Sequence, residues 1–294
     1  MRNFADRVAD AVREKGTALC VGLDPRYGLL PREITGVAES APAALWVFNK
    51  EVIEIASGEV GAVKVQVAFY ERYGWEGMEV FGETLRYARE RGLLTIADVK
   101  RGDIGSTAEA YAEAYLRGDS PFSADAITVN PYLGEEGVRP FAEAAAEGGR
   151  GVFVLVRTSN PSADYVQSFG AEKVYVRVAE MVGKLGKGKE GECGYSGVGA
   201  VVGATRGEEL EVLRGMLPKA LFLVPGYGAQ GGKGEDVAGA FDDEGLGAIV
   251  NSSRGIIHSY AGPEEKGWRE SIRGAIEKAK EDLRRWCRGT RASG

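Results

Sequence analysis

Short apolar and β-branched runs recur along the chain, and segments with helical periodicity separate them. The eight runs predicted to be strands are TALCVGL, GAVKVQVAF, LLTIADV, AITVNPY, GVFVLVR, GVGAVVGAT, ALFLVPG and GAIVNSS. Residues 75–91 and 135–147 lie between such runs and carry Ala, Glu, Arg and Leu in helical register. Strands that alternate with helices pair in parallel, so eight such units predict an α/β fold of the closed (β/α)₈ TIM-barrel type.

The length of 294 residues suits a single barrel domain spanning residues 1–294. At the N-terminus, Phe4, Val8 and Val12 have helical spacing among interleaved charges, which indicates an amphipathic helix rather than a signal peptide. The Gly- and Lys-rich segment 184–197 is expected to be a mobile loop, and the tail from about residue 288 to be frayed.

Composition narrows the class of protein. With 44% hydrophobic and 27% charged residues, the chain is typical of a soluble globular protein, and no run is apolar enough to cross a membrane. A net charge of −6 argues against a nucleic-acid surface, although basic residues inside a cleft could still bind a small anion. We therefore expect a cytoplasmic protein with a small-molecule partner.

Cysteine and histidine usage limits the available chemistry. The three cysteines lie far apart, with no CxxC pair, and the chain has a single histidine, so neither a disulfide framework nor a zinc site is expected. Cys20, inside the first predicted strand, is expected to be packed, and His258 to be structural or solvated.

Three charges gather where the third predicted strand ends, at Asp98, Lys100 and Asp103 in TIADVKRGDIGST. Residues two apart in a strand share a face, so Asp98 and Lys100 are expected to point into the barrel mouth and touch. In the second strand, alternation places Lys64 on the inward face, where it needs a carboxylate partner, and Asp98 on the next strand is available. A solvated charge cluster and a snorkelling lysine are the alternatives.

Two Gly-rich segments, VPGYGAQGGKGED and VNSSRGIIHSY, follow the seventh and eighth strands. Barrels often bind phosphate there, because glycines let backbone N–H groups approach an anion, and Arg254 could add a charged contact. A Gly-rich loop alone is more often a turn, but two at these strands with an arginine favour a phosphate site.

The chain resembles the orotidine 5'-phosphate decarboxylase family, specifically its longer bacterial branch (type 2). The run Asp98-Val99-Lys100-Arg101-Gly102-Asp103-Ile104 matches the family's signature, and GLDPR, VKVQVAFYE, TVNPYLG, RTSNPS and PGYGAQGG accompany it in the expected order over residues 20–260. The resemblance implies a barrel of the ribulose-phosphate-binding type that converts orotidine 5'-phosphate to UMP and CO₂ in pyrimidine biosynthesis, without a metal or cofactor.

The resemblance also implies roles for individual residues. Lys64, Asp98 and Lys100 match three members of a charged tetrad, and Asp103 matches the member that enters the partner subunit's site, which implies a homodimer with shared active sites. The residues matching substrate contacts are Asp24 and Thr107 for the ribose region, Ser159 for the pyrimidine edge, and Gln230 and Arg254 for the phosphate.

Two rival interpretations remain. Mg²⁺-dependent sugar-phosphate decarboxylases and aldolases of the same barrel group share the DxKxxD run, but a lysine at position 64, where that group places an acid, would repel the cation. A non-catalytic nucleotide-phosphate binder is the second, and it would have no reason to keep four alternating charges.

Overall fold

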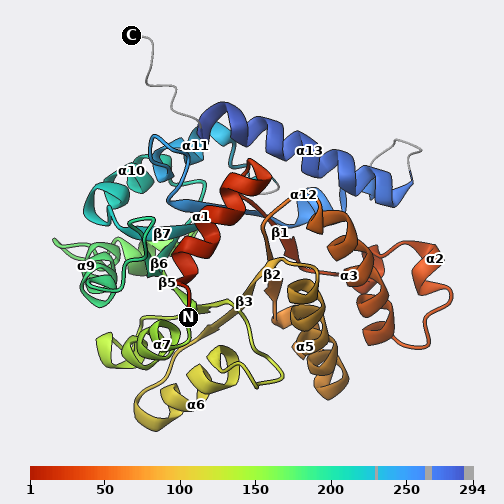
Figure 1. Cartoon of the computed structure of the whole chain (residues 1–294), viewed down its shortest axis with the longest axis horizontal. Coiled ribbons are helices and arrows are strands. Elements are labelled where there is room, and N and C mark those ends of the chain that lie inside the picture. The colour runs from red at the N-terminus through yellow and green to blue at the C-terminus, as the bar shows by residue number, and fades with distance from the viewer. Residues whose placement is uncertain (229–230, 262–266, 288–294) are drawn as a thin grey trace.

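Eight parallel strands close into a barrel in their order along the sequence, and β8 pairs with β1 (Figure 1). The computed structural model describes residues 1–228, 231–261 and 267–287. The strands are β1 (Leu19–Leu23), β2 (Ala62–Gln66), β3 (Leu94–Arg101), β4 (Ala126–Val129), β5 (Gly151–Arg157), β6 (Ser196–Val202), β7 (Ala220–Pro225) and β8 (Ala248–Ser252). The predicted TIM barrel is thereby confirmed, with one strand in each of the eight runs.

Helices follow the strands and surround the barrel (Figure 1). The α-helices are α1 (Phe4–Lys15), α2 (Arg32–Thr35), α3 (Ala41–Ser57), α4 (Ala68–Glu71), α5 (Gly74–Glu90), α6 (Gly105–Leu116), α7 (Glu135–Glu147), α8 (Ala163–Gln167), α9 (Val174–Gly186), α10 (Gly207–Met216), α11 (Gly234–Val237), α12 (Arg254–Ile257) and α13 (Trp268–Cys287). Short 3₁₀ helices cover Tyr27–Leu29, Ala238–Ala240 and Ser259–Ala261. The helices predicted over 75–91 and 135–147 are confirmed as α5 and α7.

The apolar residues form two cores on the two sides of the barrel wall. The outer core lies between the strands and the helices and includes Val63, Val65 and Val67 of the second predicted strand. The inner core fills the barrel, with Ala62 and Phe153 among its members. Alternate residues of the second strand therefore face opposite sides, as the sequence pattern predicted.

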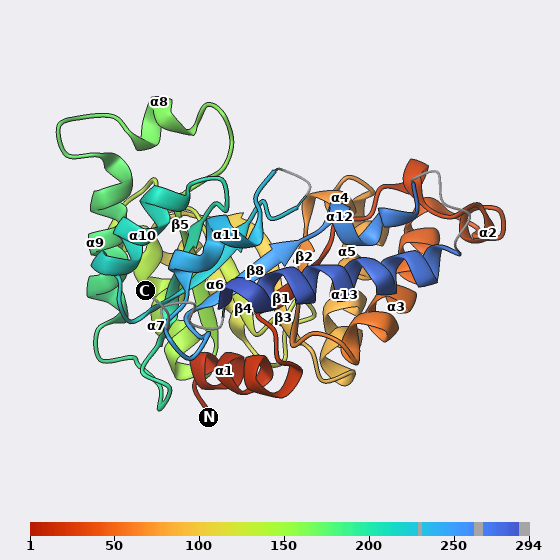
Figure 2. The same ribbon diagram turned by 90° about the horizontal axis from the view of Figure 1, so that it is seen from above.

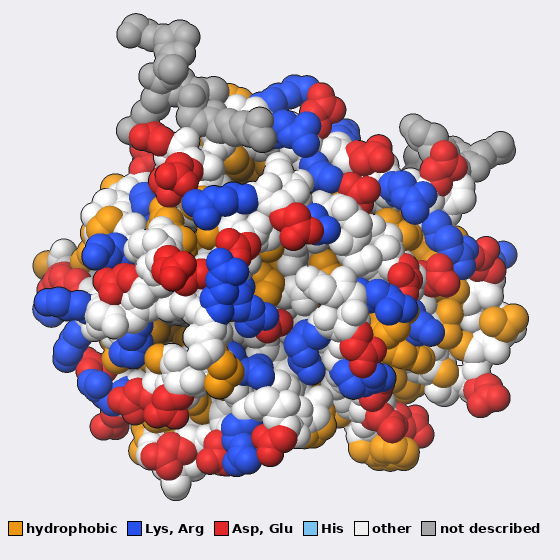
Figure 3. Space-filling model, viewed as in Figure 1, with side chains coloured by type: hydrophobic (Ala, Val, Ile, Leu, Met, Phe, Trp, Pro, Cys, Tyr) orange, Lys and Arg blue, Asp and Glu red, His pale blue; other side chains and the backbone are white. Residues whose placement is uncertain are grey.

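Helix α1 closes the bottom of the barrel, at the N-terminal ends of the strands (Figure 2). Its Phe4 and Val8 join the inner core. Arg7 donates to Asp125 Oδ1 at 2.5 Å, and Asp125 directly precedes β4. On this face of the molecule, acidic and basic side chains are interspersed (Figure 3). The barrel therefore remains open only at the C-terminal ends of the strands among the described residues, where a ligand can enter.

The predicted loop 184–197 is shorter in the structure, because residues 184–186 end α9 and residues 196–197 begin β6, so that residues 187–195 link the two elements. This segment contacts α1. Asn3 Nδ2 donates to the Lys189 carbonyl at 3.0 Å, and the Cys193 N–H donates to Asp6 Oδ1 at 2.8 Å. These contacts place the segment at the bottom of the barrel, and its mobility stays a prediction. The tail from residue 288 lies outside the described residues. No described helix has the length and apolar character needed to span a membrane.

Candidate active site

A cavity of about 510 Å³ opens at the C-terminal ends of the strands. Its volume lies in the range of small-molecule sites. Charged and polar side chains from six strands or the loops after them face it, and they are Asp24, Lys64, Gln66, Asp98, Lys100, Thr128, Thr158, Ser159, Asn160, Gln167, Asn251, Ser253 and Arg254. Leu155, Val201, Leu223 and Pro225 form an apolar part of the wall.

Three of the predicted catalytic residues form a row of alternating charge in this cavity. Lys64 Nζ lies 2.6 Å from Asp98 Oδ2, and Lys100 Nζ lies 2.5 Å from Asp98 Oδ1. The side chains of Lys64 and Asp98 are 5% and 9% exposed, whereas that of Lys100 is 46% exposed. Lys64 thus supports the row from below, and Lys100 presents its ammonium group to the open cavity.

Asp98 has further hydrogen-bond partners. Gln66 Nε2 donates to Oδ2 at 2.9 Å, and the Thr128 hydroxyl donates to Oδ1 at 2.9 Å. Burial alone would raise the pKa of Asp98, but the two ammonium groups and their hydrogen bonds outweigh it and hold this pKa below its ordinary value. For Lys64, burial likewise opposes the charge, and the attraction of Asp98 and Asp24 raises its pKa overall. Both groups are therefore charged at neutral pH.

The backbone of β3 is irregular where the row is built. The pairing of β3 with β4 runs from Ala97 with Ile127 to Arg101 with Val129, so four steps along β3 match two along β4. Lys100 has a φ of +46°, which is positive without being a glycine. Its N–H donates to Thr128 Oγ1 at 2.9 Å. Bulges and strained residues of this kind re-aim side chains at functional sites, and here the bulge turns Lys100 toward Asp98.

Three predicted substrate contacts line the same cavity from other strands. Asp24 follows β1, Ser159 follows β5, and Arg254 begins α12 after β8. Asp24 Oδ1 is buried and has no hydrogen-bond partner among the described residues. A buried carboxylate oxygen without a donor is suited to accept a hydrogen bond from a bound hydroxyl group.

Two predicted residues lie away from this cavity. Asp103 is half-buried, and its Oδ1 accepts a hydrogen bond from the Ile104 N–H at 2.8 Å. Thr107 is exposed on α6. Neither lines the cavity of its own chain. The predicted phosphate contact Gln230 lies outside the described residues.

The prediction omitted several polar residues that the structure brings to the cavity. Gln66 shares the inward face of β2 with Lys64, a signal already present in the alternation of VKVQV. Thr128 and Asn251 lie near the ends of β4 and β8, but one polar residue in a strand carries no distinct signal. Gln167 reaches the cavity from α8, eight residues after Ser159, and no local pattern predicts this.

The residues that the prediction set aside are structural. Cys20 is fully buried in the inner core, where burial raises its pKa to about 12. His258 is buried at the end of α12, and its ring stacks against Phe48. The described ranges contain no group of three or more His, Cys, Asp or Glu side chains able to hold a metal ion.

Comparisons with known proteins agree with this architecture. The orotidine 5'-phosphate decarboxylase of Rhodopirellula baltica is 43% identical to this chain, over 97% of the chain and 100% of that protein. The orotidine 5'-phosphate decarboxylase of Clostridium perfringens is 42% identical, over 94% of this chain and 100% of that protein. The structure of Leishmania donovani OMP decarboxylase superposes with a TM-score of 0.75 at 30% identity, covering 97% of this chain and 98% of the other. A family model matches residues 17–268, and the chain belongs to the orotidine 5'-phosphate decarboxylase / HUMPS family.

Proposed function

We propose that the cavity decarboxylates orotidine 5'-phosphate to UMP, with Lys64, Asp98 and Lys100 as its charged row. The observation that carries the proposal is an ionised, nearly buried carboxylate between two ammonium groups in an open cavity. Such an arrangement has no need of a partner cation beyond the two lysines. It therefore favours electrostatic catalysis by the protein's own side chains.

The reaction breaks the bond between C6 of the pyrimidine and its carboxylate, and the electron pair stays on C6. This pair lies in the ring plane and cannot delocalise into the π-system, so the charges around it must lower the barrier. A reduction on the order of 20 kcal/mol is at the upper end of enzyme catalysis and requires preorganised charges together with binding energy from the whole substrate.

Each member of the row has a part in this scheme. Asp98 lies beside the departing carboxylate of the substrate. Repulsion between the two negative charges raises the energy of the bound substrate, which helps CO₂ to leave. Lys100, the exposed member, stabilises the carbanion and donates a proton to C6, and it regains this proton from solvent. Lys64 holds Asp98 ionised and oriented from the buried side.

The rest of the nucleotide is held by residues on other strands. Asp24 accepts hydrogen bonds from ribose hydroxyls through its buried oxygen, Ser159 reads the pyrimidine edge, and Arg254 binds the phosphate together with Gln230. The three residues described by the structure belong to β1, β5 and β8 or the loops after them, so they reach the cavity from separate sides. Binding at several points fixes the reacting carbon against the charged row.

A homodimer completes the proposed site. Asp103 and Thr107 do not line their own cavity and are accessible to a second copy of the chain. Beside them, Ile104, Tyr132 and Leu133 are 50%, 84% and 46% exposed. Exposed apolar residues next to a polar group are typical of a subunit interface. Asp103 of one subunit would then contact Lys100 of the other and complete the tetrad.

The proposal is tested by following the absorbance of orotidine 5'-phosphate in buffer with excess EDTA, for the wild type and Lys100→Ala. Rapid loss in the wild type and none in the folded variant is the expected result. Turnover that requires added Mg²⁺ would favour the sugar-phosphate enzymes of this barrel group. Binding without turnover would favour the nucleotide-phosphate binder.

A further inference from the structure

Arg157, the last residue of β5, is a charged residue whose side chain is buried in the protein interior. Its side chain is 1% exposed, and it lies two residues before Ser159. A buried guanidinium group is costly unless acidic partners compensate it. The acidic partners of Arg157 therefore identify the structural elements that this residue connects.

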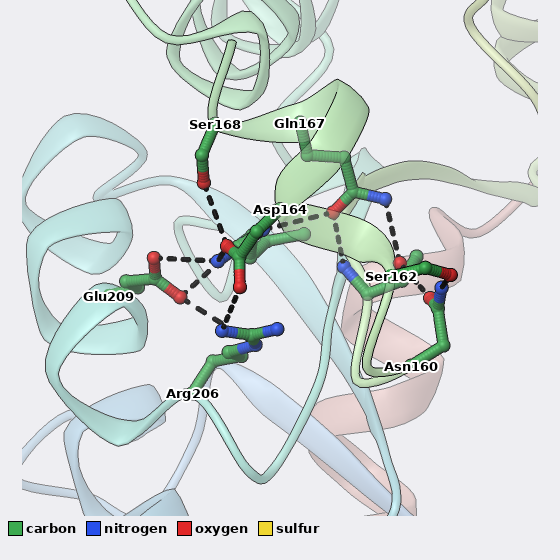
Figure 4. Close-up of polar contacts among 9 residues, drawn as sticks. Asn160, Ser162, Asp164, Gln167, Ser168, Arg206 and Glu209 are labelled. Carbon is green, nitrogen blue, oxygen red and sulfur yellow. Dashed lines mark hydrogen bonds and ion pairs between the residues drawn. The ribbon is translucent and has the colours of Figure 1, made fainter.

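Arg157 joins two elements that follow different strands. Its Nε and Nη2 bind both carboxylate oxygens of Glu209 on α10, at 2.8 and 2.9 Å. Nη2 also lies 2.5 Å from Asp164 Oδ1 on α8. The other Asp164 oxygen accepts a hydrogen bond from Arg206, and Figure 4 shows both acids beside Arg206. The ion pairs thus connect α8, which projects above α9 and α10 at one side of the molecule (Figure 2), to the first turn of α10.

The pKa shifts have the direction that these ion pairs predict. Hydrogen bonds from Arg157 and Ser168 lower the pKa of Asp164 to about 2, although this carboxylate is 55% exposed. Burial disfavours the charged form of Arg157, but hydrogen bonds to Glu209 and Asp164 raise its pKa overall. The guanidinium group is therefore charged at neutral pH.

Helix α8 in turn holds the residues on both sides of Ser159. Gln167 Oε1 accepts from the Thr158 N–H at 2.9 Å, and Gln167 Nε2 donates to the Thr158 hydroxyl at 2.7 Å. The Thr158 hydroxyl then donates to Asn160 Oδ1 at 2.6 Å. These bonds hold the Thr158 backbone N–H and the side chains of Thr158 and Asn160, the two residues that flank Ser159.

On its other side, Ser159 lies directly against the β6 loop. A Cβ added to Gly203 would lie 2.8 Å from the Ser159 Cβ and 2.9 Å from its backbone nitrogen. Only glycine permits this approach. Ser159 is therefore set between Gly203, after β6, and α8, which Arg157 anchors.

We propose that Arg157 is a positioning residue whose ion pairs to Asp164 and Glu209 hold α8, and through it Ser159, in place to recognise the pyrimidine base. This inference rests on the proposed function, because it assigns base recognition to Ser159. Loosening the anchor removes binding energy contributed by the base. The charged row and Arg254, which other strands carry, keep their own contacts.

The test compares the affinities for UMP and ribose 5-phosphate, which share ribose and phosphate and differ by the base. Arg157→Lys keeps the charge but cannot bind two carboxylates with a planar fork. We expect this variant to lower the affinity for UMP about tenfold, which is consistent with a small misplacement of a contacting group. The affinity for ribose 5-phosphate should fall less than about twofold. The ratio of the two dissociation constants reports base recognition independently of stability.

Arg214→Lys is the matched control. Arg214 binds the carbonyls of Leu217, Ala220, Ala240 and Gly247 at the bottom of the barrel, far from the mouth. We expect this variant to lower the melting temperature and leave the affinity ratio at its wild-type value. An equal change of the ratio in both variants would overturn the inference, because the effect would then be one of general destabilisation.

Asp164→Asn keeps the test decisive if Arg157→Lys does not fold. This substitution at a half-exposed side chain weakens the hold on α8 while the buried pair with Glu209 remains. We expect the ratio to shift in the same direction, and folded Asp164→Asn with the wild-type ratio would overturn the inference. Wild-type turnover of orotidine 5'-phosphate is measured in parallel, so that failure of the proposed function is distinguished from failure of this inference.

Discussion

The Thr128 hydroxyl donates a 2.9 Å hydrogen bond from β4 to Asp98 on β3, and it accepts the N–H of Lys100. The hydroxyl therefore connects the carboxylate of Asp98 to the strained backbone of Lys100. We expect Thr128→Val, which keeps the shape but not the hydroxyl, to lower kcat by roughly 10- to 100-fold, the equivalent of one hydrogen bond to a charged group. Steady-state kinetics with orotidine 5'-phosphate measure this.

Thr95→Val is the control for that variant. Thr95 also lies on β3, but its hydroxyl bonds to Asp125 at the bottom of the barrel. It should cost stability and leave kcat unchanged. Wild-type kcat in Thr128→Val would show that Gln66 and the two lysines position Asp98 without the hydroxyl.

Arg254→Ala tests the phosphate contact. We expect kcat/KM to fall by about 100-fold or more, because a lost charged contact to phosphate is worth about 3 kcal/mol. The affinity for UMP should fall similarly, whereas uridine, which lacks the phosphate, should bind both proteins alike. A loss below tenfold, or an equal loss of uridine binding, would contradict the assignment.

Asp98 should lose its contribution to the stability of the fold only when the pH falls below about 4. Its folded pKa is lower than its unfolded value of about 3.9, so its contribution is complete above that value and disappears as the pH falls toward the folded pKa. The contribution of Lys64, whose pKa is raised, is complete below about pH 10 and disappears as the pH rises further.

Urea unfolding of the wild type and Asp98→Asn measures this dependence. At pH 7 the variant should lose about 3 kcal/mol, because two lysines are left without their carboxylate. The difference should persist at pH 5 and shrink by pH 3. Asp10→Asn, which affects the exposed pair with Arg2, should show little difference at any of these values. A difference that stays the same between pH 5 and pH 3 would mean that the pKa of Asp98 in the folded protein is close to its ordinary value.

Mixing two inactive variants tests the shared site. Asp103→Ala and Lys100→Ala would each inactivate both sites of their own dimer, but a mixed dimer has one site with both residues intact. After unfolding together and refolding, random pairing should restore about a quarter of the wild-type activity. Refolding each variant alone is the control. Absence of recovery in a preparation shown to contain mixed dimers would place Asp103 in its own subunit's site.

The barrel and the central row were predictable because both depend on short-range patterns. Alternation in β2 places Lys64 inside, and its neighbour Asp98 is the partner that such a lysine requires. The contact of Asp98 with Lys100 was predicted from a regular strand, but it is made by a bulge and a positive φ at Lys100. The prediction was correct about the contact and incomplete about its geometry.

The anchor at Arg157 was not predictable from the sequence. An arginine at the end of an apolar strand is equally compatible with a solvated position, and its partners Asp164 and Glu209 lie 7 and 52 residues away. Their meeting depends on how α8 folds back and how β6 places α10. Asp103 and Thr107 illustrate the same limit, because the role proposed for them depends on a second chain, which no pattern within one chain describes.

Closure of the barrel by α1 has a practical consequence for handling the protein. The N-terminal residues leave from the face opposite the catalytic mouth (Figure 2). A fusion partner or surface linker joined ahead of Asn3 would therefore orient the mouth toward the surrounding solution. Such a linker must spare Asn3 and Arg7, whose contacts with Lys189 and Asp125 keep the helix seated beneath the strands.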